Sequence, residues 1–187
     1  AVLREAWRLA PLLLPYLFLL GVLATLSGAV TPSHPIPAVP EGWLFIHIGV
    51  SVATYALATL PAIAGLAVVI QERALTRKRP GAFTDLLPSI ADGERLQLRF
   101  LGMAEMVLGA GLVTGMALEY LERGVPLIFD HKTVLSLLTF ALIGLLLHLN
   151  HRVGIRGRQA GRLVLLAYLL LTLAYPGVKF VSDVLLG

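Results

Sequence analysis

Five long apolar runs dominate the chain and leave few folds open to it. They lie near residues 9–30, 44–70, 98–120, 133–150 and 163–186. A helix of about 20 apolar residues crosses the ~30 Å hydrocarbon core of a bilayer. Because backbone polar groups need partners in lipid, and the sequence lacks the alternating pattern of barrel strands, each run is predicted to be a helix. We therefore expect residues 1–187 to form a single all-α, polytopic transmembrane helix bundle of about five spans.

Composition agrees with a membrane protein. Hydrophobic residues make up 57% of the 187 positions and charged residues 14%, whereas soluble domains have about 45–50% and 25%. Cysteine is absent, which excludes disulfides, iron–sulfur ligation and a thiol nucleophile, and leaves His, Asp and Glu for chemistry. The net charge of +4 is typical of retained cytoplasmic loops, so we expect a lipid bilayer and no nucleic acid as partner.

The basic residues predict the orientation of the bundle. With the N-terminus inside, twelve of the fifteen Lys and Arg residues fall on the cytoplasmic side, as the positive-inside rule requires. This assigns an N-in, C-out topology with outer loops 31–43 and 121–132 and inner loops 71–97 and 151–162. Within the first inner loop, the apolar spacing of residues 84–99 fits either an interfacial segment or an ordinary loop. The chain starts at Ala1 without Met, which is compatible with further helices before it.

Several histidines are predicted near the outer face. His47 lies just inside the outer end of the second span, His34 and His131 fall in the outer loops, and Asp130, His131 and Lys132 open the fourth span. The three imidazoles could converge there, and neutral imidazole is a common ligand of haem iron. The alternative for each histidine alone is an interfacial side chain bonded to backbone or headgroup.

A second group lies near the inner end of the fourth span. His148 and His151 are three residues apart and can share a helix face. His148 is predicted about one turn inside the membrane, where a polar side chain is costly unless it faces the bundle or a partner. On this topology His47 and His148 lie on opposite membrane sides and would belong to separate sites.

One carboxyl group is predicted well inside the membrane. Glu105 lies in the third span between small residues that permit close helix packing, so we expect it to point into the bundle as a functional or network residue. Lys179 and Asp183 in the last span are four residues apart and are predicted to pair. Phosphate-loop, zinc-protease and serine-hydrolase motifs are absent from the sequence.

From Trp43 onward the chain resembles the integral membrane cytochrome c assembly family, the CcsA, CcmC and HemX group, most closely its YpjD-type branch. The resemblance rests on the order of five blocks: LFIHIGVSVATYALATLPAIAGL, LPSIADGERLQLRFLGM leading into LVTG, DHKTVLSLLTF, GIRGRQAG and LAYPGVKFV. It implies a multi-pass protein of the bacterial inner membrane that handles haem.

The resemblance also implies roles for particular residues. Asp130 and Lys132 match the Asp and Lys of the family's WDPKE-like motif, and His148 matches a haem-ligating histidine eighteen residues after that Asp. His47 matches the histidine that opens the helix after the family's outer loop. On this basis His47 and His148 are candidate haem-iron ligands at separate sites. If haem binds there, the basic side chains of Lys132, Arg152 and Arg156 could meet its propionates. The alternative for the two arginines is a topological role with contact to anionic headgroups.

The chain also departs from the haem-attaching members of that family. It has no tryptophan between Glu119 and Asp130, carries His131 and Thr133 where the motif has Pro and Glu, and has no histidine after the last span. We therefore expect a non-enzymatic protein that binds haem or assists a membrane assembly or haem-trafficking complex. The alternatives are a haem-free scaffold or regulatory subunit of a larger complex and, third, an ion or solute transporter.

Overall fold

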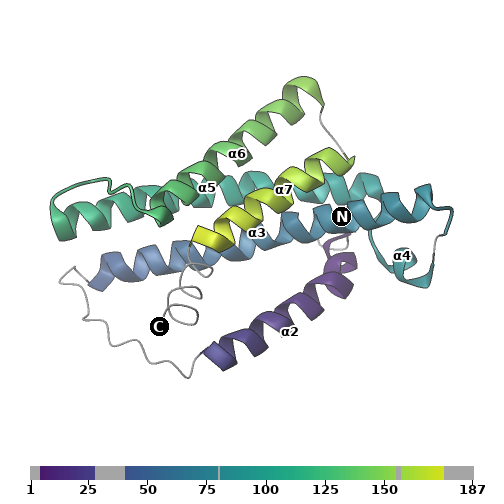
Figure 1. The fold of residues 1–187 in the computed structure, drawn as a ribbon, viewed down its shortest axis with the longest axis horizontal. Coiled ribbons are helices and arrows are strands. Elements are labelled where there is room, and N and C mark those ends of the chain that lie inside the picture. The colour runs from purple at the N-terminus through teal and green to yellow at the C-terminus, as the bar shows by residue number, and fades with distance from the viewer. Residues whose placement is uncertain (1–4, 28–40, 80, 155–156, 175–187) are drawn as a thin grey trace.

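The computed structural model describes residues 5–27, 41–79, 81–154 and 157–174. A 3-10 turn, η1 (Trp7–Leu9), leads into α2 (Ala10–Ser27), which is followed by α3 (Glu41–Thr76) and the short α4 (Ala82–Leu86). The long helices α5 (Ile90–Arg123) and α6 (His131–Val153) come next, and α7 (Gly157–Thr172) closes the described part (Figure 1). Since these elements are all helical and several are strongly apolar, the prediction of an all-α membrane helix bundle is confirmed.

Three of the helices are long and apolar enough to cross a membrane. These are α3, α5 and α6, and shorter apolar helices cover Trp7–Val22 and Gln159–Thr172. Each predicted apolar run overlaps one helix, although the first run, 9–30, and the last run, 163–186, extend beyond the described residues. The total of five spans and the N-in orientation remain predictions, as does the pairing of Lys179 with Asp183, which lie outside the described residues together with His34.

Helix α5 begins earlier than its apolar run. Ser89 acts as its N-cap, because its hydroxyl oxygen accepts the backbone N–H of Asp92 at 3.2 Å, as Ser commonly does at a helix start. Most of the segment 84–99 therefore belongs to α4 and to the first turns of α5. The N-cap signal is present in the sequence, but the apolar run that predicted the span starts only at residue 98.

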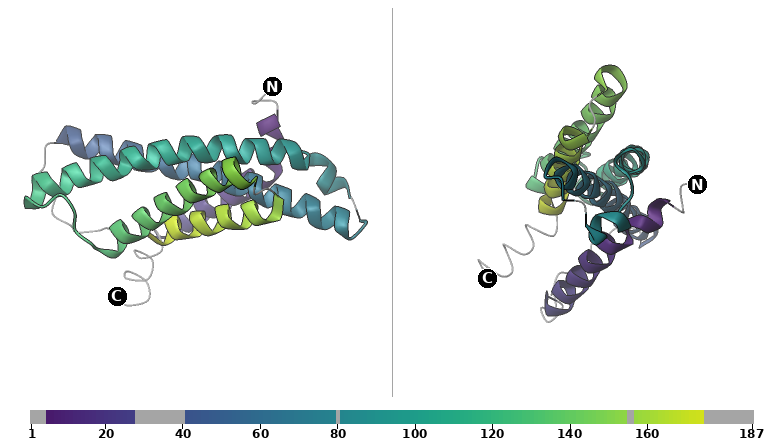
Figure 2. Two further views of the ribbon diagram at one scale, coloured as in Figure 1. Left: turned by 90° about the horizontal axis from the view of Figure 1, so that it is seen from above. Right: turned by 90° about the vertical axis from the view of Figure 1, so that its right-hand side faces the viewer.

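Helix α3 is the central element of the bundle. Within its most apolar stretch 61% is buried by the rest of the chain, against 17% in α5 and in α6. Small residues make this position possible, since a Cβ on Gly161 of α7 would lie only 3.2 Å from the carbonyl oxygen of Gly65 in α3. Such close contacts are how helices pack in lipid. Helices α2 and α6 diverge from this centre in opposite directions (Figure 2, right).

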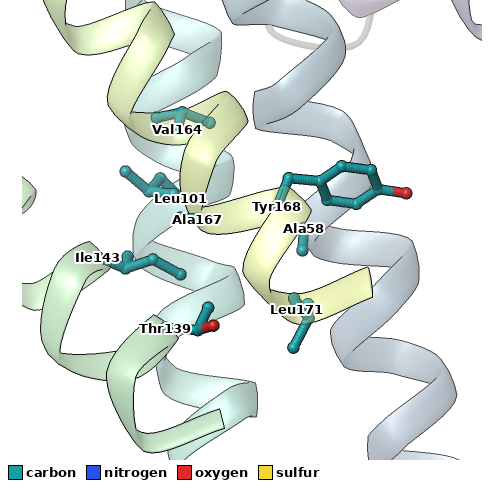
Figure 3. A pocket seen from close by; sticks show the side chains of 8 residues that line it. All are labelled: Ala58, Leu101, Thr139, Ile143, Val164, Ala167, Tyr168 and Leu171. Carbon is teal, nitrogen blue, oxygen red and sulfur yellow. The ribbon is translucent and has the colours of Figure 1, made fainter. Parts of the chain in front are cut away.

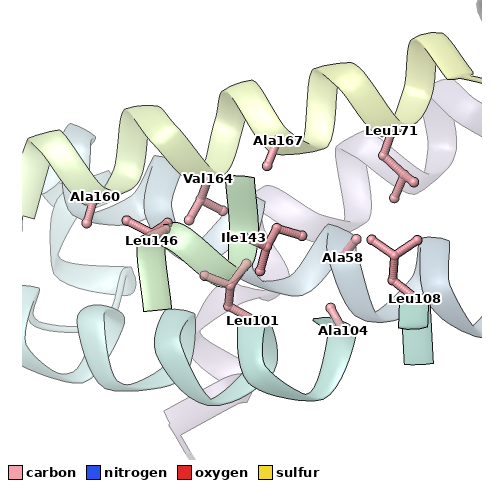
Figure 4. Close-up of a cluster of buried hydrophobic side chains, with 10 residues drawn as sticks. All are labelled: Ala58, Leu101, Ala104, Leu108, Ile143, Leu146, Ala160, Val164, Ala167 and Leu171. Atoms are coloured by element: carbon pink, nitrogen blue, oxygen red, sulfur yellow. The ribbon is translucent and has the colours of Figure 1, made fainter. Parts of the chain in front are cut away.

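The larger core cluster joins α3, α5, α6 and α7 (Figure 4). It consists of ten buried side chains: Ala58, Leu101, Ala104, Leu108, Ile143, Leu146, Ala160, Val164, Ala167 and Leu171. A smaller cluster around Leu9, Leu87 and Leu96 ties the N-terminal segment to the start of α5. Hydroxyl groups hold α2 as well, because Tyr16 is hydrogen-bonded to Tyr168 of α7, whose hydroxyl lies 3.0 Å from that of Thr59 in α3.

Candidate functional site

His47 is the candidate ligand that the fold positions best. It lies in the second turn of α3 and its half-buried ring rests against α5. Nδ1 of the ring is 3.0 Å from Oγ1 of Thr114. The next residue, Gly115, leaves room for the ring, because a Cβ there would come within 3.2 Å of Cε1 of His47. Two adjacent α5 residues thus fix one face and one nitrogen of the imidazole.

The hydrogen bonds around Thr114 assign the tautomer of His47. The Thr114 hydroxyl donates its single proton to the carbonyl oxygen of Gly111 at 3.1 Å. Its oxygen is then an acceptor, so Nδ1 of His47 carries the hydrogen and donates it. The remaining nitrogen, Nε2, keeps its lone pair. An imidazole held through one nitrogen with the other unprotonated is the form that binds a metal.

The Asp130, His131 and Lys132 group forms the start of α6. Oδ1 of Asp130 accepts the backbone N–H of Thr133 at 2.8 Å, so Asp130 caps the helix. Partial burial on its own raises the pKa of Asp130, but the hydrogen bonds from Thr133 and the nearby charges of His131 and Lys132 outweigh it, and the net pKa is below the usual value. His131 and Lys132 are exposed.

His148 lies on the outside of the described bundle. It and Arg152 are exposed near the C-terminal end of α6, together with His151. A polar side chain in an apolar span either meets a partner or faces lipid at some cost, and the exposure of His148 means that the described helices do not enclose it. Arg156 lies outside the described residues.

The structure keeps His47 and His148 far apart. A Cβ on Gly144 of α6 would lie 3.1 Å from Oε1 of Glu105 in α5, which fixes the two helices relative to one another. Thr114, the partner of His47, is nine residues beyond Glu105, or about 13 Å along α5. His148 lies one turn from Gly144 in the opposite direction. The two imidazoles are therefore too distant to ligate one iron atom.

Glu105 points into the seam between α5 and α6. Its Oε2 atom is buried and has no hydrogen-bond partner among the described residues. The absence of a side chain at Gly144 makes room for the carboxyl group. A buried polar atom without a partner is costly in an apolar environment, which favours a functional or network role for Glu105, and that role stays a prediction.

The cavity inside the bundle is too small for a haem. It lies between α3, α5, α6 and α7, is lined among others by Ala58, Thr139 and Tyr168, and measures about 10 Å³ (Figure 3), which is space for a single water molecule. No group of three His, Cys, Asp or Glu side chains in the described segments is arranged to hold a metal ion. A haem held by His47 would therefore have to approach from the surface of the bundle, where Nε2 is the ring nitrogen left for the iron.

Sequence reasoning missed the residues that position His47. Thr114 and Gly115 belong to the LVTG block, whose small residues indicate close helix packing and nothing more specific. The sequence does not reveal which α5 residue lies opposite His47, because the register between two antiparallel helices depends on their packing. A Thr-Gly pair on a facing helix is a signal that could have suggested a support for a histidine.

The comparisons with known proteins agree with the order of the motifs. The profile of the family described as Cytochrome C assembly protein matches residues 5–186. An uncharacterized 28.8 kDa protein in a nifR3-like 5' region of Azospirillum brasilense is 57% identical, with all of this chain and 69% of the relative aligned. The inner membrane protein YpjD of Escherichia coli K12 is 26% identical, over 97% of this chain and 67% of its own. Protein HemX of Brevibacillus brevis is 24% identical, with 85% of this chain and 60% of the relative aligned. No solved structure matches this chain.

Proposed function

This chain belongs to the cytochrome c assembly protein family, and we propose that it binds haem at the membrane surface of its bundle and serves a haem-handling or cytochrome assembly complex. The family match over residues 5–186 carries this proposal. The support from the structure is the His47 imidazole, held through Nδ1 by Thr114 with Nε2 unprotonated. The Escherichia coli relative is an inner membrane protein, and we propose the bacterial inner membrane for this chain too.

Each residue has a distinct part in the proposed binding. Haem, when bound, supplies an iron with axial positions for imidazole nitrogen. His47 presents Nε2 to an outer site, Thr114 orients the ring, and Lys132 meets a propionate. His148 serves a separate inner site, with Arg152 and Arg156 as the basic groups for propionates. Because His148 is exposed, its site requires a partner or lipid to cover the other face of the haem.

The proposed role is binding and not covalent attachment. The stretch between Glu119 and Asp130 has no tryptophan, and so lacks the aromatic outer platform of the haem-attaching relatives. The chain would thus hold or pass haem for another protein.

An absorption spectrum of the detergent-purified protein tests this function. The proposal predicts a haem Soret band that weakens in His47→Ala and in His148→Ala and disappears in the double variant. His151→Ala is the matched control, since His151 is an exposed histidine of the same helix as His148 with no assigned role. Haem bands that persist in the double variant would show that these histidines are not the ligands.

A haem-free scaffold is the second candidate, favoured by the large exposed apolar face of α5, where Met106 is 71% and Val113 67% exposed. Such a face suits lipid and partner helices equally. Affinity purification tests the scaffold. Stoichiometric recovery of a membrane partner by wild type and by both histidine variants, all without haem, is the result that this candidate predicts.

A further inference from the structure

An open groove lies at the end of the bundle where α3 ends and α5 begins, away from His47. Its volume is about 520 Å³. It is lined by Trp7 and Arg8 of η1, by Ala10, Pro11 and Leu14 of α2, and by Asp85 and Leu86 of α4. The α4 wall is held in place from α3, because Nε2 of Gln71 donates to the carbonyl oxygen of Thr84 at 2.7 Å. The groove is therefore a built feature between two anchored segments.

Two opposite charges line the groove without pairing with each other. One guanidinium nitrogen of Arg8 donates to the main-chain carbonyl oxygen of Asp85 at 2.8 Å. The Asp85 carboxylate is not within ion-pair distance of Arg8, and the one ion pair between described residues is Arg123 with Glu119. Arg8 has further N–H donors to offer, and both side chains are exposed. The groove is thus lined by one cationic and one anionic residue.

The remaining lining residues are apolar. Leu14 of α2 is 63% exposed, and Leu86 of α4 is 57% exposed. Trp7 is 77% exposed, and an exposed indole beside a basic residue is typical of the headgroup level of a bilayer. The lining thus combines two charged residues with apolar ones, as a site for an amphipathic lipid requires.

We propose that this groove binds a zwitterionic aminophospholipid, with the phosphate on Arg8, the primary ammonium on Asp85 and an acyl chain along Leu14 and Leu86. Charge complementarity selects this occupant. The glycerol of phosphatidylglycerol is uncharged and leaves the Asp85 carboxylate without a counter-charge, and the quaternary ammonium of phosphatidylcholine has no N–H to donate to it. Phosphatidylethanolamine has both the phosphate and the N–H donors.

Native mass spectrometry of the delipidated full chain tests the site. Phosphatidylethanolamine, phosphatidylglycerol and phosphatidylcholine with identical acyl chains are added in turn to protein in detergent. We expect wild type to retain phosphatidylethanolamine about fivefold more tightly than either other lipid, the scale of one partly exposed charge interaction.

Two variants separate the two charges. Asp85→Asn keeps the main-chain oxygen that Arg8 contacts, so the groove stays intact, and the preference for phosphatidylethanolamine over phosphatidylglycerol should be lost. Arg8→Gln should weaken retention of all phospholipids. Arg123→Gln, at the far end of α5, is the control and should change neither result.

Three outcomes overturn the proposal: equal retention of the three lipids by wild type, an unchanged preference in Asp85→Asn, or release of the bound lipid by millimolar inorganic phosphate. The last would identify a plain anion site. None of these measurements depends on haem, so failure here and failure of the proposed function are separate results.

Discussion

Position 114 decides how the candidate iron ligand is presented. Without a hydroxyl there, Nδ1 of His47 loses the group that accepts its hydrogen at 3.0 Å, and the ring can rotate or change tautomer. Thr114→Val keeps the shape of the side chain but removes the hydroxyl. We expect its haem dissociation constant to rise about 10- to 100-fold, as for other groups that orient metal-bound histidines.

The control for this prediction is Thr114→Ser, which retains the hydroxyl and should bind haem within about twofold of wild type. The measurement is the dissociation constant obtained from Soret absorbance. Equal haem dissociation constants for Thr114→Val and wild type would show that Thr114 does not contribute to haem binding.

Asp130 gives a second prediction at the level of single residues. Its carboxylate caps α6 by accepting the N–H of Thr133 at 2.8 Å, so Asp130→Ala should lower the free energy of unfolding by about 1 kcal/mol at neutral pH. Because the pKa of Asp130 is lowered from 3.8 in the folded protein, the contribution of its charge is present above pH 3.8 and is lost as pH falls below that value.

Thermal unfolding in detergent at pH 6 and pH 3 measures this effect. The difference in unfolding temperature between wild type and Asp130→Ala should be smaller at pH 3 than at pH 6. The control compares the unfolding temperatures of Asp130→Asn and Asp130→Ala. Asn still caps the helix, and because neither side chain is charged, the difference between these two variants should not change with pH. A larger difference between wild type and Asp130→Ala at pH 3 than at pH 6 would contradict the assignment of Asp130 as a charged cap.

At the level of helices, the packing of α5 against α3 depends on Gly93. A Cβ there would lie 2.7 Å from Cγ2 of Val68, and a short branched side chain has little freedom to move away. Gly93→Ala should therefore destabilise the bundle by about 1–3 kcal/mol, the range for overpacking. The measurement is thermal or denaturant unfolding in detergent.

Gly102 of the same helix supplies the matched control. A Cβ there meets nothing within 4 Å, so Gly102→Ala should leave stability unchanged or raise it through the higher helix propensity of Ala. The same substitution would thus have different effects at two positions of one helix. Equal losses in both variants would mean that α3 and α5 do not pack in the register described.

The order of the helices could be predicted from the sequence, and their mutual register could not. Run length and apolarity predict the long helices, because a membrane span needs little more than those two properties. The partner of His47 and the seam beside Glu105 depend on how neighbouring helices slide and rotate. His148 shows the limit most clearly, since its sequence position favours burial or a partner, whereas its exposure depends on how α6 diverges from the centre.

At the scale of the whole molecule, orientation across the membrane is open to direct measurement. The chain has no cysteine, so a single introduced thiol reports one position without background. Val125→Cys, in the exposed connection after α5, should react with a membrane-impermeant maleimide in intact spheroplasts. Arg79→Cys, exposed between α3 and α4, should react only after the membrane is permeabilised. The reverse pattern would invert the N-in assignment and move the His47 site to the cytoplasmic side.

Haem binding through His47 is the central claim, and titration of haem-free protein in detergent with hemin tests it most directly. We expect wild type to give a saturable Soret band. His47→Ala should lose the outer-site part of that band, and His151→Ala should titrate like wild type. A wild-type protein that gives no Soret shift with excess hemin, or a His47→Ala variant with the same titration curve as wild type, would contradict the claim.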